Sequence, residues 1–301
     1  MSLLHPVARL SLSEFSVHPS TTIGIAIFAA AYIWRAKQGP AAADRLPVRV
    51  TAQTANAAQL DLAAAPQGPT PAQRLAYFTS LALLFLTLNG PLHDVSDFYL
   101  FSGHMVQHLL LTLIVPPLMI VGTPGWMLRP LLRRPGLFVA ARTLTSITWC
   151  FVIFNVVLAF WHLPPLYNLA LANHGVHIAQ HLMFIAASVL MWWPLMSPLP
   201  ELPRAAYPAQ MLYCFLMVIP MSIISIYIAM ADTLLYPAYA AAPRILGITP
   251  MQDQQYGGLI MWIPGGVFFY AVMTVVFFKW SNRGEDTEES AQVGWVPTTT
   301  P

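Results

Sequence analysis

The sequence predicts an all-α protein, a polytopic bundle of about seven transmembrane helices with its N-terminus outside and its C-terminus inside. Of its 301 residues, 57% are hydrophobic and only 9% are charged, and its mean hydropathy is +0.60. Soluble domains carry about 25% charged residues, so this composition indicates a membrane protein. Its two cysteines lie in apolar runs and indicate neither a disulfide nor a CxxC site.

The apolar runs, taken in order, are separated by segments rich in proline, glycine or charge. A polar arm over residues 1–15 precedes the first span, and a flexible cytoplasmic loop over residues 35–71 follows it. Residues 72–281 form a six-span domain, and residues 282–301 form a disordered cytoplasmic tail. Prolines at 116, 117 and 220 should kink their spans, because proline cannot donate a helical hydrogen bond. The expected spans are 16–34, 73–88, 102–121, 137–161, 174–196, 209–230 and 256–280.

The placement of basic residues predicts the orientation of the bundle. With the 35–71 loop inside, every Lys and Arg except Arg9 and Arg244 lies on the inner side, as the positive-inside rule requires. All nine histidines then lie on the outer side, in loops or in the outer ends of helices. The inner half of the membrane has none.

The outer histidines follow a repeated pattern. Residues 104–109 and 177–182 both read His-x-x-Gln-His-Leu, and a Pro-Leu pair stands upstream of each copy. Histidines four residues apart share one helical face and can bind one metal ion. Because histidine is the commonest transition-metal ligand and ionisable groups inside membranes are usually functional, these positions are candidate metal ligands. The full candidate set is His104, His108, His177, His181, His162, His93 and His174.

Other polar residues near these positions receive structural interpretations. His5 and His18 are interpreted as helix caps or interfacial residues. The outer carboxylates either attract a cation and orient histidines or are solvated loop charges, and the second interpretation is preferred for Asp97; they are Asp94, Asp97, Asp232 and Asp253. Gln107 and Gln180 either hold a histidine ring nitrogen or pair helices. Most of the methionines are interpreted as packing or lipid-facing residues.

Several motifs in combination resemble a known family. The segments are GHMVQHLLL followed by PPL and GTP, FWHLPPLYNLAL, WWPLMSPLP, MADTLLYPAY and DQQYGGLIMWIPGG. Over about residues 75–280 the chain is similar to the CtaG-type cytochrome c oxidase assembly factors. This resemblance implies a protein of the bacterial inner membrane that assembles a haem–copper oxidase and has a role with copper. The family's histidine motifs fall on His104, His108, His177 and His181, and its WH motif on His162.

Three hypotheses follow from these patterns. The first is a non-enzymatic assembly factor that binds copper at the periplasmic face and delivers it to oxidase subunits. The second is a single-haem protein with bis-histidine ligation, although the lack of inner histidines argues against electron transfer across the bilayer. The third is a copper transporter with broken helices. All three hypotheses place the protein in a lipid bilayer and expect no nucleic acid as a partner. The first also expects cytochrome c oxidase subunits as partners.

Overall fold

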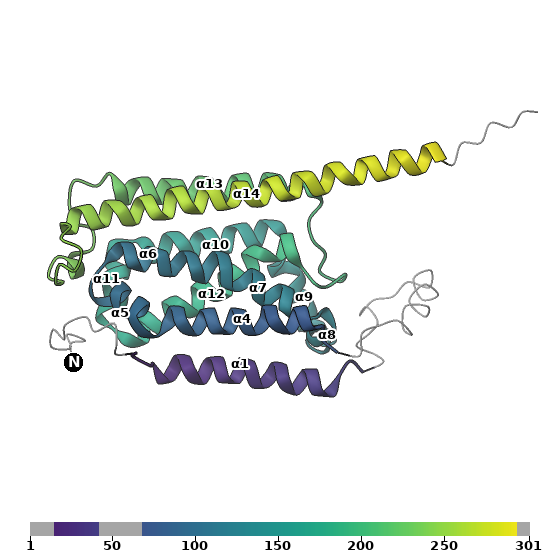
Figure 1. Ribbon diagram of the computed structural model, residues 1–301, viewed down its shortest axis with the longest axis horizontal. Helices are drawn as coiled ribbons and strands as arrows, with labels where there is room; N and C mark the ends of the chain where they lie inside the picture. Colours follow the sequence, from purple (N-terminus) through teal and green to yellow (C-terminus); the bar gives the residue numbers. More distant parts are fainter. Residues whose placement is uncertain (1–14, 42–67, 294–301) are drawn as a thin grey trace, which may run out of the picture.

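The computed structural model describes residues 15–41 and 68–293, and all regular structure within these ranges is helical. The helices are packed side by side, and most run along the long axis of the molecule (Figure 1). Their bounds are α1 Pro19–Gln38, α4 Pro71–Leu88, α5 Gly90–Phe98, α6 Phe101–Leu109, a π-helical turn Leu110–Ile114, α7 Val115–Gly122, α8 Gly125–Leu132, α9 Pro135–Leu144, α10 Ile147–His162, α11 Pro164–Ala172, α12 His174–Met196, α13 Tyr207–Ala229, a 3-10 turn Pro237–Tyr239 and α14 Pro250–Val293.

The bundle has a central group of helices with one layer on each side. Helices α13 and α14 lie side by side as a hairpin along one flank, where α14 packs on α6 and α13 packs on α10 (Figure 1). The centre contains α6, α7, α10 and α12, and the largest cluster of buried apolar residues lies between these helices and the hairpin. On the opposite flank α4 packs on α7, and α1 covers α4.

The part of the chain that the structure describes contains four helices that are long and apolar enough to cross a membrane. They are Phe101–Gly122, His174–Met196, Tyr207–Ala229 and Pro250–Asn282. Two bent pairs, Pro71–Thr87 with Gly90–Phe98 and Pro135–Leu144 with Ile147–His162, raise this number to six if each pair is one span. A membrane protein is therefore supported, but the count of seven spans is not confirmed. The expected first span forms helix α1. Its apolar part lies between Thr22 and Arg35 and is short, and α1 is not among the helices that could cross a membrane.

The expected fourth span, residues 137–161, is wrong as a single helix. Helices α9 and α10 are bent by 72° relative to each other at Thr145 and Ser146. The hydroxyl of Thr145 donates to the Ala141 carbonyl and that of Ser146 to the Thr143 carbonyl. Such local side-chain bonds compete with the helical pattern and favour a break.

The expected irregularity of the third span lies just before its prolines. A π-helical turn over Leu110–Ile114 joins α6 to α7, so that Pro116 and Pro117 fall in the first turn of α7. Proline is tolerated there because the first-turn N–H groups of an α-helix have no intrahelical acceptor.

The ends of the chain are described only in part. The arm expected over 1–15 and the loop expected over 35–71 lie mostly outside the described residues, as do residues 294–301. Helix α14 continues to Val293, past the residue at which the tail was expected to begin. After Gly284 the sequence contains no proline before Pro297, and it contains Glu285, Glu288 and Glu289, a residue type that favours helix.

Candidate metal centre

Six of the seven candidate histidines meet in the interior of the bundle. They come from α5, α6, α10 and α12, and none is more than 6% exposed. Within α6 the ring centroids of His104 and His108 are 4.2 Å apart, and within α12 those of His177 and His181 are 4.4 Å apart. Between helices the ring centroids are 5.8–6.4 Å apart. The buried set is His93, His104, His108, His162, His177 and His181, which we call the histidine cluster.

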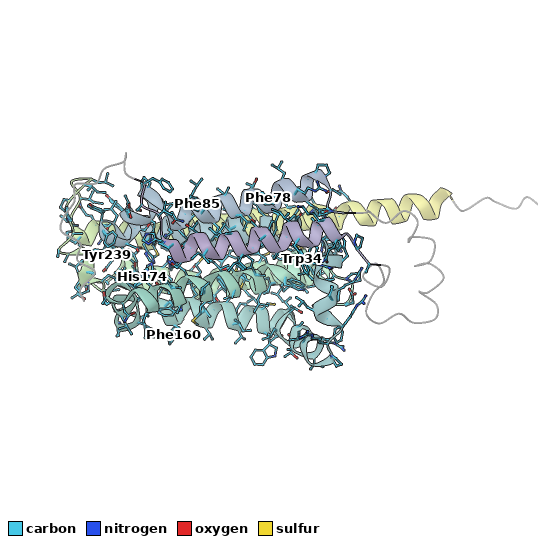
Figure 2. All side chains as sticks on the ribbon, turned by 90° about the horizontal axis from the view of Figure 1, so that it is seen from below. Trp34, Phe78, Phe85, Phe160, His174 and Tyr239 are labelled. Carbon is cyan, nitrogen blue, oxygen red and sulfur yellow. The ribbon has the colours of Figure 1, made fainter. Side chains whose placement is uncertain are left out.

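The seventh candidate, His174, lies apart from this cluster. It is the first residue of α12, it is exposed, and it lies at one end of the bundle (Figure 2). The ring of His18 lies between the exposed end and the cluster, with its centroid 6.3 Å from His174 and 4.5 Å from His93. Burial lowers the pKa of His18, whereas Asp94 acts in the opposite direction. The interpretation of His18 as a simple cap is therefore incomplete, since its ring covers His93.

Asp97 lies at the centre of the outer part of the cluster. Its Oδ2 is 3.3 Å from His177 Nε2 and 3.4 Å from His93 Nε2, and its Oδ1 is 4.0 Å from His104 Nδ1. The side chain is 13% exposed, so the interpretation as a solvated loop charge is wrong. The segment that carries it is not a loop but helix α5, which places His93 and Asp97 on one face. The i, i+4 spacing of His93 and Asp97 is the feature of the sequence that could have predicted their contact.

Gln107 fixes the orientation of His93 through one of its two hydrogen bonds. The Gln107 amide Nε2 is 2.8 Å from the Thr87 carbonyl, which only accepts, and 3.0 Å from His93 Nδ1. Nδ1 of His93 therefore accepts, and the neutral ring carries its proton on Nε2, facing Asp97. In this state His93 holds the carboxylate in place and is not itself free to bind a metal through Nε2. Gln107 thus combines the two roles expected for it, ring contact and helix pairing.

His162 has the opposite arrangement. Its Nδ1 is 2.7 Å from the Leu158 carbonyl, so Nδ1 is the donor and Nε2 carries the lone pair. A backbone carbonyl that fixes the tautomer in this way is typical of metal-binding histidines. The main chain at this point is held by the Tyr236 hydroxyl, which donates to the His162 carbonyl at 2.9 Å.

The cluster contains many buried polar atoms that lack a hydrogen-bond partner among the described residues. Leaving such an atom unsatisfied costs about 1–3 kcal/mol, so their accumulation at one place makes the cluster a candidate binding site. A metal ion suits the donor set of imidazole and carboxylate. The atoms are both ring nitrogens of His104 and His108, Nε2 of His162, His177 and His181, and Oδ1 of Asp97.

The spacing around Asp97 fits a small ion. Two ligands that are each about 2.1 Å from a tetrahedral metal lie roughly 3.4 Å from each other. The 3.3 Å between Asp97 Oδ2 and His177 Nε2 matches this value, and His177 Nε2 has no hydrogen-bond partner among the described residues. His93, Asp97 and His177 offer three ligand atoms within 4.8 Å of one another. Because of the tautomer of His93, we regard His104 as the better third ligand.

Side-chain hydrogen bonds cap the N-termini of α6 and α12, two of the helices that carry the cluster. Asp253 of α14 accepts from the N–H groups of Phe101 and Ser102 at 2.7 and 3.1 Å and from the Ser102 hydroxyl at 2.5 Å. The carboxylate satisfies free N–H groups at the start of α6 and matches the positive end of its dipole. Asn173 caps α12 through Val176 N–H. Burial raises the pKa of Tyr239, and its hydroxyl donates to the Ser96 carbonyl in α5 at 2.7 Å.

Comparison with protein families identifies the family of this chain. The family model described as cytochrome c oxidase caa3 assembly factor (Caa3_CtaG) matches residues 57–283, about three quarters of the chain. The match includes every helix from α4 to α13 and most of α14. No curated protein and no solved structure matches the chain significantly.

Proposed function

This chain belongs to the cytochrome c oxidase caa3 assembly factor family, and from that premise we propose that its histidine cluster binds copper for delivery to the oxidase. In this proposal the protein is a non-enzymatic metal carrier, and the copper ion is cargo. The cluster lies at the periplasmic face of a bacterial inner membrane, where it meets an oxidase subunit.

The observation that carries the proposal is the convergence on Asp97. A buried carboxylate is costly unless it is paired with positive charge or a metal. Here the Asp97 carboxylate lies 3.3–4.0 Å from ring nitrogens of three histidines. A monovalent or divalent transition-metal ion could bind both the carboxylate and the imidazoles. His104 and His177 supply the free ring nitrogens, and His93 orients the carboxylate.

The space inside the cluster favours an ion over haem. The cavity beside His108 and His162 has a volume of about 20 Å³, whereas sites for ligands of haem size occupy several hundred Å³. The ring contacts among His104, His108 and His181 leave little separation for a macrocycle. We therefore keep haem only as an outcome that a visible spectrum would reveal through a Soret band.

The experiment is metal analysis of the purified full-length protein after expression with added copper. We expect bound copper in the wild type and a smaller amount of copper per protein in a His104→Ala and His177→Ala double variant. Asp94→Asn is the matched control, because the Asp94 carboxylate bonds to the Ser16 hydroxyl and not to the cluster. Copper retained at the wild-type level in the double variant would contradict the proposal. Uptake of copper into vesicles that contain the protein would instead support the transporter hypothesis.

A delivery role adds a second measurement. In cells that carry the double variant, cytochrome c oxidase should be made but should contain less copper, and the oxidase activity of the membranes should fall. Normal copper content of the oxidase in these cells would exclude delivery through this cluster.

A further inference from the structure

A small cavity adjoins the histidine cluster on the side away from Asp97. It has a volume of about 20 Å³ and is lined by His108, His162 and apolar or polar residues of α6, the π turn, α10, α12, α13 and α14. A space of about 10–15 Å³ is enough to admit one water-sized particle. The cavity therefore has room for a single small guest.

The polar atoms at this cavity have no partner in the described part of the chain. Both ring nitrogens of His108 are buried and unpaired, and so is Nε2 of His162. The bond from His162 Nδ1 to the Leu158 carbonyl leaves the lone pair on Nε2, so this nitrogen can act as a ligand without losing a proton. The ring centroids of the two histidines are 5.8 Å apart.

The rest of the lining contributes sulfur. Met105 of α6, Met221 of α13 and Met261 of α14 all line the cavity, and each is at most 5% exposed. Gly265 of α14 lies directly against Met221: a Cβ at this position would be 2.9 Å from the Sδ and Cε atoms. The glycine therefore leaves space for the thioether. Three thioethers from three helices thus surround the same small space as two imidazoles.

The chemistry of this lining differs from that around Asp97. Thioether sulfur is a soft ligand that selects Cu(I), whereas carboxylate favours harder ions. None of the described residues that line the cavity is a carboxylate. Methionine is also a common gap filler in apolar cores, but an apolar core gives no reason for two unsatisfied imidazoles at the same place.

We propose that this cavity is a second metal site, selective for Cu(I), in which ligands are drawn from His108 Nε2 or Nδ1, His162 Nε2 and the thioethers of Met105, Met221 and Met261. It is separate from the Asp97 site and does not depend on metal binding there. The inner site holds a monovalent soft ion in a dry environment, out of contact with periplasmic water.

The test uses the full-length protein in detergent under anaerobic conditions, titrated with Cu(I) buffered by a competing chelator, and X-ray absorption at the copper edge. We expect sulfur as well as nitrogen neighbours around the bound Cu(I). Met221→Leu with Met261→Leu should weaken Cu(I) binding by at least about tenfold and remove the sulfur contribution. Leucine is close to methionine in volume, so these variants are expected to fold. Met230→Leu is the control, because Met230 is 75% exposed at the end of α13.

Two further outcomes separate this proposal from the previous one. In Asp97→Asn, Cu(I) with sulfur neighbours should persist even if binding at the outer site is lost. A wild-type spectrum with nitrogen and oxygen neighbours alone, unchanged Cu(I) affinity in the folded double methionine variant, or no Cu(I) uptake at all would each overturn the inner site. Thermal unfolding of each variant shows whether a loss of binding reflects a loss of fold.

Discussion

Asp97 of α5 and His177 of α12 meet with 3.3 Å between Oδ2 and Nε2, although they lie far apart in the sequence. Both side chains are largely shielded from solvent, since His177 is 6% exposed and the Asp97 side chain 13%. The contact links α5 to α12 within the histidine cluster. It makes Asp97 the residue whose removal should affect the outer site most directly.

The first prediction concerns the charge of Asp97. Asp97→Asn keeps the size of the side chain but removes its negative charge and one acceptor oxygen. We expect copper affinity at the outer site to fall about 10- to 100-fold, as is usual when a ligand or its orienting partner is lost. Equilibrium dialysis against a copper chelator measures this. Asp94→Asn should have wild-type affinity, and equal losses in both variants would show that general surface charge, not the position of Asp97, controls binding.

The second prediction concerns Gln107, which bridges His93 and the Thr87 carbonyl. Gln107→Leu leaves two buried acceptors without a donor, which should cost about 1–3 kcal/mol of stability. Thermal unfolding in detergent measures the change. The matched control is Gln180→Leu at the equivalent position of the second repeat. There both amide atoms are buried without a partner, so the same substitution should not destabilise the protein. A larger loss at Gln180 would mean that the amide of Gln180 has a partner in solution.

Part of this site follows from the sequence because helical spacing is a local property. His104 with His108, and His177 with His181, are four residues apart, and on any helix such pairs share a face. The distribution of basic residues predicts that the helix ends carrying both pairs face outward, and this orientation stays a prediction. The convergence of these rings depends on how α6 and α12 pack, but two helices with buried polar faces have few other arrangements in a membrane.

Asp97 could not be placed in the same way. Residues 90–98 begin with Gly-Pro and contain two aspartates, a composition typical of an exposed loop. In the structure the segment is helical and Pro91 occupies its first turn, where proline is tolerated. Tertiary contacts hold it there, including the bond from Tyr239 to Ser96, and these contacts come from residues distant in the sequence. The same limit applies to α9 and α10, where one continuous apolar run conceals a bend of 72°.

The third prediction concerns Asp253 as the cap of α6. Asp253→Ala removes the acceptor for two backbone N–H groups and one hydroxyl, and loss of such a cap costs about 0.5–2 kcal/mol. Because α6 carries His104 and His108, copper binding should also weaken. Thermal unfolding and copper titration on the same preparation measure both effects. Asp232→Ala, at an exposed position, is the control. Unchanged stability in Asp253→Ala would show that α6 does not depend on this cap.

The last prediction concerns the close approach of α7 to α4. A Cβ added at Gly122 would lie 2.5 Å from the backbone nitrogen of Tyr77, a distance that real Cβ atoms do not show. The neighbour is main chain and cannot turn aside, so Gly122→Ala must push the two helices apart. Overpacking of this kind costs about 1–3 kcal/mol, and it should also stretch the 3.0 Å bond from the Tyr32 hydroxyl to the Gly122 carbonyl.

Gly136→Ala in α9 provides the control for this prediction, because no atom lies within 4 Å of the added Cβ. Alanine favours helix over glycine by about 1 kcal/mol, so the control should unfold at the same temperature as the wild type or higher, while Gly122→Ala unfolds lower. If both variants unfolded at the same temperature, α4 and α7 would be able to move apart without loss of stability. The packing of Tyr32, Tyr77 and α1 against this joint would then not be a fixed part of the fold.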